Sequence, residues 1–398
     1  MEEPNYKISW SGRSVDYTDQ EIDAVIKAMK TADPLTQGKY LKEFEQKFSE
    51  YIGVKNSFAV SSATAALELS AILCRLKEGD EVIIPAHTFC ATAIPFARTK
   101  AKIIWADIDK DTRVVSAETM EKCITEKTKA MVIVHLYGLM APMDKIMELA
   151  KKNNILVVED CAQAIGAESN GKKAGSFGDF ACFSFHGQKS ITTLGEGGML
   201  VVKSDESAKM VSGLRHNGSR PYTEEREKFW KPAMSNVDFD IDNFWPYNFC
   251  IGEVQCALGL EILKTIDQQN QKRIDRAKKF EEALKEFEEL SFQKVLEDKM
   301  HVYHLLSAKY DDKKFGKTRD DLIELMTQKY LVKTIVQYYP LYRYPMFQKA
   351  GLSDANCPNT DDFFDNMVSF PFYLWMSDND FEYIIESTKK ALQELRGS

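Results

Sequence analysis

The stretch that decides the fold is Phe180-Ala-Cys-Phe-Ser-Phe-His-Gly-Gln-Lys189-Ser-Ile-Thr-Thr-Leu-Gly-Glu-Gly-Gly-Met199-Leu-Val-Val202. An apolar run stops at a short polar loop that carries one lysine, and a second apolar run follows a Gly-Glu-Gly-Gly turn. The pattern predicts two buried strands joined by a loop that holds Lys189 beside a rigid sheet. Desolvation there would favour the neutral amine, which can attack a carbonyl group. Most lysines are solvated surface charges, so the rest of the chain has to distinguish the two cases.

The composition is that of an ordinary globular protein. The chain has 398 residues, of which 44% are hydrophobic and 28% are charged, and its formal net charge is −8. This length allows a sizeable core and two domains. The mild acidity argues against a nucleic-acid-binding protein, which normally has a basic face. It is compatible with a locally positive pocket that binds an anionic small molecule.

No sequence feature indicates export, a membrane span or a metal site. The eight cysteines include no Cys-x-x-Cys pair, and most have apolar neighbours, which predicts free buried thiols in a reducing cytoplasm. The first residues lack the pattern of a signal peptide, and no apolar run approaches the ~20 residues of a membrane span. His301 and His304 form the one close pair of histidines, and in a strand their odd spacing would point them to opposite faces. We therefore expect a cytoplasmic protein without a metal ion.

Short apolar runs alternate with helical segments through the first half of the chain. Strands are expected at 57–60, 81–85, 101–105, 130–135 and 155–158, and helices at 20–29, 40–51, 65–76, 92–96, 118–123 and 142–152. Such alternation predicts βαβ units around a buried, mostly parallel sheet. Ligands of such sheets bind at the carboxyl ends of the strands. Pro85, Asp160 and the loop after Phe185 all lie at such ends.

The alternation breaks down after residue 222. Residues 222–245 are rich in charge and aromatic rings, and we expect a long loop that is too apolar to be disordered. Helices are expected again at 252–263, 271–287, 319–328 and 379–395, and strands at 301–310 and 333–337. We expect a large α/β domain over residues 1–265 and a small α+β domain over residues 266–398.

At the shared edge of the sheet, these residue types would suit one cofactor. The helix that begins near Ala63 and Thr64 has free backbone N–H groups that can bind a phosphate, although a plain helix cap explains the same residues. Phe89 could stack on a flat ring, Asp160 could keep a ring nitrogen protonated, and Lys189 could form an imine with an aldehyde. A serine five residues before the lysine lies between two phenylalanines, so its inward-facing hydroxyl needs a partner.

Three motifs in this region resemble those of one known family. They are Glu-Asp-Cys-Ala-Gln-Ala at 159–164, Gly-Ser-Phe-Gly-Asp at 175–179, and Ser-Phe-His-Gly-Gln-Lys at 184–189, the last followed by Gly-Glu-Gly-Gly. The chain is thus similar, from about residue 17 to residue 395, to the pyridoxal-phosphate-dependent sugar aminotransferases of the DegT/DnrJ/EryC1/StrS family. The resemblance implies a fold-type I α/β architecture, in which helices flank a mostly parallel central sheet and a smaller C-terminal α+β domain follows.

The resemblance also implies a role for each candidate residue. Lys189 would form the imine with pyridoxal 5'-phosphate and would then move the proton between substrate and cofactor carbons. Asp160 would pair with the pyridinium nitrogen, Gln163 would lie near the ring face or its phenolic oxygen, and Phe89 would stack on the ring. The phosphate would be held by three residues of one chain and by an asparagine of the neighbouring subunit, namely Ala63, Thr64, Ser184 and Asn248. The active unit would then be a homodimer with shared active sites.

Most of these residues also have an ordinary structural explanation. Asp160 could cap the turn that follows it, Phe89 could belong to the core, and Asn248 could be a turn residue. Glu196 could be only a turn acid, since it lies between glycines. For Lys189 the functional interpretation is the stronger one, because the motif around it is not typical of a surface lysine.

Lysine at position 189 also indicates the type of reaction. Some relatives carry histidine there and act as dehydratases, so the lysine favours amino transfer. By family analogy, L-glutamate would give its amino group to a keto sugar, with a nucleotide-linked keto-deoxysugar as the first candidate. The product would serve lipopolysaccharide, other surface polysaccharide or amino-sugar biosynthesis. A dehydratase and a non-catalytic pyridoxal-phosphate-binding regulator are weaker alternatives, the latter because no basic DNA-binding segment is evident. Nucleic acid and membrane partners are not expected.

Two positions near the expected substrate site depart from the family pattern. Pro-Tyr-Asn-Phe-Cys stands at 246–250 where many relatives have Gly-Tyr-Asn and a basic residue, and Tyr342 replaces the histidine of a Tyr-Pro-Leu-His run. A free acidic keto sugar, such as an oxidised octulosonate, or a keto-cyclitol is therefore an alternative substrate. Arg215, Arg220 and Arg343 are candidate contacts for an anionic group of the substrate, although each alone is more ordinary as a surface residue.

Overall fold

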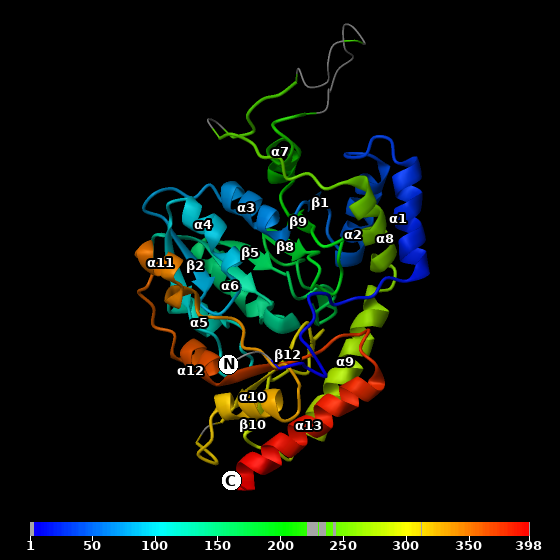
Figure 1. Ribbon diagram of the computed structural model, residues 1–398. Helices are drawn as coiled ribbons and strands as arrows, with labels where there is room; N and C mark the ends of the chain where they lie inside the picture. The colour runs from blue at the N-terminus through cyan, green and yellow to red at the C-terminus, as the bar shows by residue number, and fades with distance from the viewer. Residues whose placement is uncertain (1–3, 221–229, 231–235, 242–243, 312, 398) are drawn as a thin grey trace.

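The computed structural model describes residues 4–220, 230, 236–241, 244–311 and 313–397. Within them, a seven-stranded sheet has the order β1-β9-β8-β5-β4-β2-β3 (Figure 1). Its strands are β1 (Ser57–Val60), β2 (Glu81–Pro85), β3 (Lys102–Ala106), β4 (Thr128–Val134), β5 (Leu156–Asp160), β8 (Phe180–Ser184) and β9 (Gly198–Val202). The strands from β8 to β3 are parallel, whereas β9 runs antiparallel to both β1 and β8. The expected mostly parallel sheet is confirmed.

Helices cover both faces of this sheet, because its strands are apolar on both sides. In β9, Met199 and Val201 belong to one hydrophobic core, whereas Leu200 and Val202 belong to the other. The first core is closed by α2 (Lys39–Ile52), α5 (Ala117–Glu121), α6 (Met143–Asn153) and α8 (Glu253–Leu263). The second is closed by α3 (Ala63–Leu73), α4 (Ile94–Arg98), α7 (Asp205–Arg215) and α11 (Pro345–Lys349). The helix α1 (Asp19–Thr31) packs outside, against α8.

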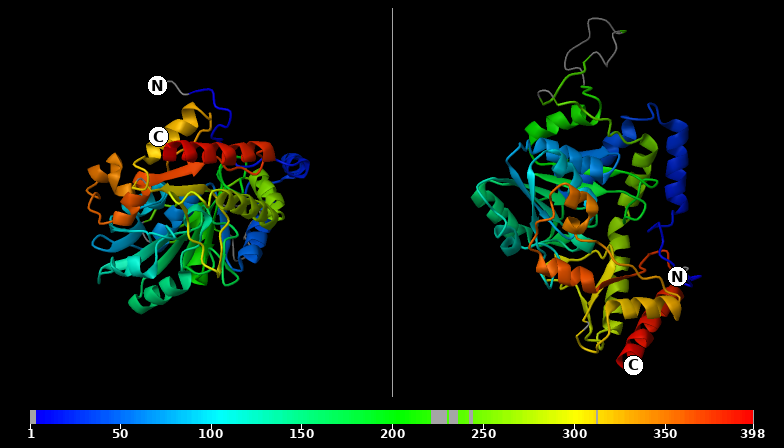
Figure 2. Two further views of the ribbon diagram at one scale, coloured as in Figure 1. Left: turned by 90° about the horizontal axis from the view of Figure 1, so that it is seen from below. Right: turned by 60° about the vertical axis from the view of Figure 1, so that its left-hand side comes forward.

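The C-terminal third forms a smaller unit with its own core. An antiparallel sheet of order β10-β12-β13 packs with α9, α10 and α13, and α9 leads to it from the large unit (Figures 1 and 2). The elements are α9 (Ile266–Ala283), β10 (Leu290–Phe292), β12 (Leu306–Tyr310), α10 (Arg319–Gln328), β13 (Met367–Phe370) and α13 (Asp378–Gly397). Between the units, β11 (Lys299–Met300) pairs with the hairpin of β6 (Glu168–Ser169) and β7 (Lys172–Lys173).

Segments distant in sequence cross between the two units. Ile8 lies in the core of the small unit and bridges to Val332, so the N-terminal segment starts there before it leads to α1 (Figure 1). Conversely, Phe363 of α12 (Pro358–Asn366) packs into a core of the large unit. We keep residue 265 as the proposed domain boundary; it falls between α8 and α9.

Several expectations for the second half of the chain are wrong. Residues 333–337 form no strand, because their strand pairing is limited to one bridge, between Ile335 and Ser369. The expected strand 301–310 begins only at Leu306, so the strand geometry invoked for the histidine pair does not apply. The helices α7 and α12 and the strand β13 were not expected. Much of the proposed loop 222–245 lies outside the described residues.

Two further expectations concern the cysteines and the membrane. All eight cysteines are free, and none is exposed. Among the helices that the structure describes, none has the length and apolar character that a membrane crossing requires.

Candidate active site

The ends of two neighbouring parallel strands define the site. Asp160 ends β5 and Ser184 ends β8, and the register pairs Asp160 with Cys182. The chain then leaves β8 through a loop that carries Lys189 and returns as β9, where Gly198 pairs with both Ser184 and Val60. All of these residues therefore lie at one edge of the sheet, as the sequence predicts.

Lys189 lies in a desolvated position above this edge. Burial lowers the pKa of its ammonium group from 10.5 to about 8, and the negative charge of Asp160 opposes part of that fall. At pH 7.5 this shift increases the neutral fraction of the amine by roughly two hundredfold. The N-terminal segment holds the loop, since Ser14 donates its amide to Gly187 O at 3.1 Å and its hydroxyl to Lys189 O. Lys189 is half-buried and not exposed, which argues against an ordinary surface lysine.

The carboxylate of Asp160 is buried and oriented by two hydrogen bonds. Its Oδ2 accepts from Thr92 Oγ1 at 2.7 Å, and its Oδ1 accepts from the Ala162 amide at 3.0 Å. The contact with the Ala162 amide is the turn cap that the sequence analysis gave as the structural alternative for Asp160. The carboxylate also acts on the site, because it affects the pKa of both Lys189 and Tyr338. Structural and functional interpretations are therefore compatible here.

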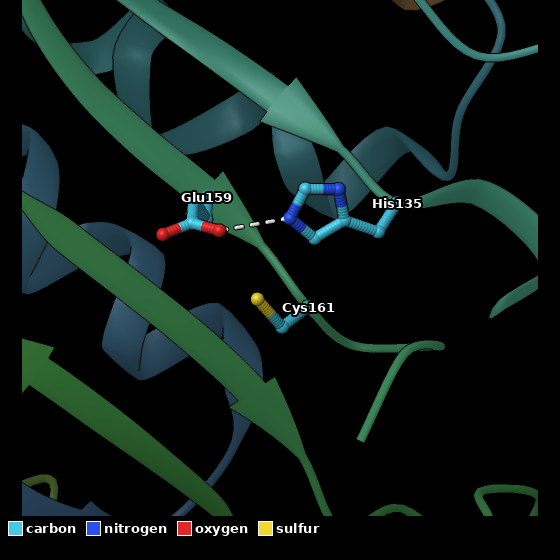
Figure 3. Close-up of side chains that lie close together, drawn as sticks. All are labelled: His135, Glu159 and Cys161. Carbon is cyan, nitrogen blue, oxygen red and sulfur yellow. Dashed lines mark hydrogen bonds and ion pairs between the residues drawn. The ribbon is translucent and has the colours of Figure 1, made fainter. Parts of the chain in front are cut away.

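Beside Asp160, the buried residues His135, Glu159 and Cys161 lie close enough together for three metal ligands (Figure 3). Their hydrogen bonds favour a structural role instead. His135 Nδ1 accepts from the Ala141 amide at 3.2 Å, so its Nε2 carries the proton and donates to Glu159 at 2.9 Å. Burial alone would raise the pKa of Glu159, but the His135 hydrogen bond and backbone amides outweigh it and lower the pKa.

Gln163, Phe89 and Tyr338 gather on one side of the site. Gln163 accepts from the Tyr137 amide at 2.7 Å and donates to the Tyr338 hydroxyl at 3.1 Å. The ring centroids of Phe89 and Tyr338 lie 5.8 Å apart. Phe89 is 52% exposed, so the alternative that it belongs to the core is wrong. An exposed ring at the mouth of a site is what a stacking platform requires.

The start of α3 closes the opposite side and can hold an anion. Ser62 caps the helix by accepting from the Ala65 amide at 3.1 Å, and the first amides of any α-helix lack intrahelical partners. Those amides belong here to Ala63 and Thr64. Gly198 lets the helix start approach the strand, because a Cβ at Gly198 would lie 2.4 Å from the Ser62 carbonyl carbon. The helix start thus lies next to the end of β8, where Ser184 is.

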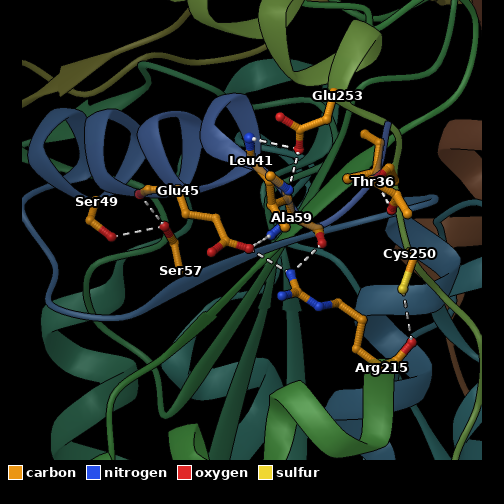
Figure 4. A network of polar contacts seen from close by, with 11 residues as sticks. Thr36, Leu41, Glu45, Ser49, Ser57, Ala59, Arg215, Cys250 and Glu253 are labelled. Atoms are coloured by element: carbon orange, nitrogen blue, oxygen red, sulfur yellow. Dashed lines mark hydrogen bonds and ion pairs between the residues drawn. The ribbon is translucent and has the colours of Figure 1, made fainter. Parts of the chain in front are cut away.

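The remaining candidates all have partners within the chain. Arg215 is buried, so its interpretation as a surface residue is wrong; its Nη1 lies 2.5 Å from Glu45 and 2.6 Å from Ala59 O (Figure 4). Arg220 pairs with Asp240 at 2.9 Å.

Tyr342 is buried and donates to Asp361, and Arg343 pairs with Asp365 at 2.8 Å. Asn248 is exposed and its Oδ1 accepts from the Cys250 amide at 3.3 Å, as a turn residue would. Substrate contacts by the arginines and Tyr342 stay predictions, as does the cross-subunit role of Asn248.

Sequence reasoning missed several residues that the fold brings to Lys189. Ser14 holds the lysine loop, whereas His304 and Tyr338 line the same small cavity as Lys189. The tyrosine-rich run at 338–342 could have pointed to Tyr338, since this run departs from the family pattern. Nothing in the local sequence around Ser14 or His304 indicates their proximity to the lysine.

Comparison with known proteins identifies this arrangement. The model of the DegT/DnrJ/EryC1/StrS aminotransferase family matches residues 16–389. The chain belongs to this family. Spore coat polysaccharide biosynthesis protein SpsC of Bacillus subtilis is 32% identical over 376 residues, which cover 94% of this chain and 95% of that protein. GDP-perosamine synthase of Escherichia coli O157:H7 is 31% identical over 384 residues, or 96% of this chain and 97% of the synthase.

A solved structure of the same family has the same fold. The putative sugar aminotransferase Spr1654 from Streptococcus pneumoniae, in its PMP form, matches with a TM-score of 0.87 at 26% identity, covering 98% of this chain and 100% of that chain. The present protein is a pyridoxal-phosphate-dependent sugar aminotransferase of the DegT/DnrJ/EryC1/StrS family.

The residues at the sheet edge fit this cofactor. A desolvated amine at Lys189 suits its aldehyde, the oriented carboxylate of Asp160 suits a protonated ring nitrogen, and the uncapped amides at the start of α3 suit its phosphate. The close approach at Gly198 makes this last site possible.

We expect Gly198→Ala to weaken cofactor binding. The added Cβ would lie 2.6 Å from the Ala63 nitrogen, so the start of α3 has to move away from Ser184. The affinity of the apoenzyme for pyridoxal phosphate, measured by absorbance titration, should fall about tenfold or more. Gly397→Ala is the matched control, because its Cβ meets nothing within 4 Å. An unchanged affinity of Gly198→Ala would contradict the assignment of the phosphate site.

The reactivity of Lys189 should follow its lowered pKa. Only the neutral amine attacks an aldehyde, so the rate at which the apoenzyme reacts with pyridoxal phosphate should rise with pH through a midpoint of about 8. Asp160→Asn removes the charge that stabilises the ammonium form, and the midpoint should therefore move to lower pH. Stopped-flow absorbance at a series of pH values measures the midpoint for the wild type and for Asp160→Asn. A midpoint near the ordinary 10.5, or one that Asp160→Asn leaves in place, argues against a desolvated Lys189.

Proposed function

We propose that the protein transfers the amino group of L-glutamate to a nucleotide-linked keto-deoxysugar. The observation that carries this proposal is the desolvated amine of Lys189 next to the carboxylate of Asp160 at the edge of the sheet. The relative from Escherichia coli O157:H7, which is named for a GDP-linked amino sugar, supports the substrate class. The Bacillus subtilis relative is named for polysaccharide biosynthesis, and we propose surface polysaccharide or amino-sugar biosynthesis as the destination of the product.

Pyridoxal phosphate supplies an aldehyde and an electron-withdrawing ring, which make a C–H bond of the bound substrate acidic. The chain's own residues do the rest. Lys189 holds and moves the proton at its Nζ, which a pKa of about 8 suits near neutral pH. Thr92 and Ala162 hold the carboxylate of Asp160 in place, where it would accept a hydrogen bond from a protonated ring nitrogen. The amides of Ala63 and Thr64, together with Ser184, would hold the phosphate.

The other side chains orient the ring. Phe89 presents an exposed face for stacking, and Gln163 stays in place because both ends of its amide are bonded. An acidic keto sugar has less support, since Arg215, Arg220 and Arg343 already pair with carboxylates of the chain. A dehydratase also has less support, because it has no use for a lysine at position 189.

We also propose that the active unit is a homodimer with shared sites. The support is an apolar row on the outer face of α1, where Ile22 is 44% exposed, Ile26 is 41% exposed and Met29 is 66% exposed. A contiguous apolar surface of this kind is characteristic of a protein–protein contact. Asn248 and Phe89 are exposed as well, so a second copy of the chain can reach the site.

Purified holoenzyme should convert L-glutamate to 2-oxoglutarate when a nucleotide-linked keto-deoxysugar is added. A coupled glutamate dehydrogenase assay across a panel of keto sugars, acidic keto sugars and keto-cyclitols identifies the substrate. Lys189→Ala should reduce turnover at least about a thousandfold, because it removes both the amine and the proton carrier. Lys203→Ala, at a lysine outside the site, is the control. Turnover that survives in Lys189→Ala would overturn the proposed mechanism.

The dimer proposal predicts the oligomeric state in solution. Light scattering after size exclusion should give twice the mass of the 45.4 kDa chain. Ile26→Glu with Met29→Glu should shift the protein toward the monomer and lower its activity, because charge replaces the apolar contact. Leu296→Glu changes another exposed apolar residue, at 41% exposure, and should leave the dimer intact. A monomeric wild type that is fully active would contradict the shared site.

A further inference from the structure

Arg273 is a buried cation, and two of its three guanidinium nitrogens lack hydrogen-bond partners among the described residues. It lies on α9, is 1% exposed, and its Nε and Nη2 have no partner among the described residues. Burial and the neighbouring cation of Arg276 together lower its pKa to about 10, which leaves it charged at neutral pH. A buried charge without a counter-ion is costly, and a fold that keeps one has a reason to do so.

Two other buried arginines, Arg215 and Arg113, have hydrogen-bond partners within the chain. Arg215 pairs with Glu45 at 2.5 Å. Arg113 is buried as well, but its Nη2 donates to Ser291 O at 2.5 Å and to Ser291 Oγ at 3.0 Å. Its guanidinium also lies over the Phe363 ring at 4.5 Å. The Arg273 guanidinium carbon lies farther from its nearest aromatic partner, at 5.9 Å from the centroid of the Phe372 ring. Arg113 also has an Nε and an Nη1 without a partner, so unpaired nitrogens alone do not set Arg273 apart; what distinguishes Arg273 is that its side chain lines a cavity beside Lys189.

The side chain of Arg273 lines a cavity of about 50 Å³ that Lys189 also lines. The N-terminal segment contributes Ser14, and the small unit contributes His304 and Tyr373. Of the thirteen lining residues, two are cationic and none is a carboxylate. The cavity is thus a positively charged space next to the reactive amine.

The size and chemistry of the cavity limit its occupant. At roughly 10–15 Å³ for one water, it holds several waters or one small anionic group, and it excludes a nucleotide. Burial and the cations Lys189 and Arg273 push the pKa of His304 well below its usual range, so His304 is neutral and adds hydrogen-bonding capacity without charge. The fork of a guanidinium matches the two oxygens of a carboxylate.

We propose that Arg273 binds a carboxylate of the amino-acid donor, which places the donor's reacting carbon beside Lys189. The inference rests on the proposed function and names a residue for donor recognition. A carboxylate could also come from an acidic keto sugar, which shares this chemistry. The small volume of the cavity favours the donor, since a donor extends from its carboxylate by a short chain only.

Binding of two unreactive carboxylates to the holoenzyme tests the proposal. Glutarate represents the donor and glucuronate represents an acidic sugar, and calorimetry gives the Kd of each. We expect wild type to bind glutarate, Arg273→Gln to weaken that Kd about tenfold or more, and Arg273→Lys to restore part of it. Without ligand, Arg273→Gln should be at least as heat-stable as wild type, because it removes an unpaired buried charge. Glutarate should raise the melting temperature of wild type alone.

Lys278→Gln is the matched control, because it removes the same charge from an exposed position of α9 and should not change either Kd. If Arg273→Gln weakens the binding of glucuronate but not that of glutarate, Arg273 does bind a carboxylate, but the carboxylate belongs to the sugar and the donor assignment is overturned. The proposal is overturned if wild type binds neither compound, if both Kd values survive Arg273→Gln, or if that variant loses heat stability without a change in Kd.

Turnover of L-glutamate by the wild type, measured in parallel, separates this inference from the proposed function. If the wild type turns over L-glutamate but glutarate binding does not depend on Arg273, the carboxylate site at Arg273 is overturned and the proposed function is kept. Absence of turnover, together with binding that depends on Arg273, overturns the proposed donor and leaves the site.

Discussion

A carboxylate with no exposure to solvent joins the two strands on which the site depends. Glu159 of β5 accepts hydrogen bonds from His135 and from the amides of Gly175, Phe177 and Gly178, which lie in the turn that leads into β8. Each of these groups would be costly to bury without a partner. Together they fix β5 against β8. Because parallel strands present their carboxyl ends at one edge, Asp160 and Ser184 then have little freedom of position.

The chemistry of the site follows from a balance between burial and charge. Burial disfavours the ammonium form of Lys189, while Asp160 stabilises it, and the resulting pKa of about 8 keeps the group able to both give and take a proton near neutral pH. The same burial leaves Arg273 charged without a counter-ion. The large unit thus carries the candidate cofactor groups of this chain, whereas the N-terminal segment and the small unit contribute residues to the cavity beside Lys189.

The parts of the fold that could be predicted are those that local pattern determines. The apolar runs around Lys189 became β8 and β9 because both faces of these strands are buried. The segment 333–337 shows the limit, since Thr334, Ile335 and Val336 favour a strand but the chain forms only one isolated bridge there. In the site, motifs predicted the candidate residues on the large unit, and the fold brings Asp160, Ser184 and Lys189 to one edge of the sheet. The approach of Ser14, His304, Arg273 and Tyr338 depends on how distant segments fold together, which no local pattern encodes.

The central claim is that Lys189 is the amine that bonds to the cofactor, because the fold desolvates it beside Asp160. Borohydride reduction of the holoenzyme makes the bond between an amine and the cofactor's aldehyde permanent, and mass spectrometry of the digested protein then locates it. The account predicts one cofactor per chain, attached to the peptide that contains Lys189. Attachment to another lysine, or recovery of the Lys189 peptide without added mass, would contradict it.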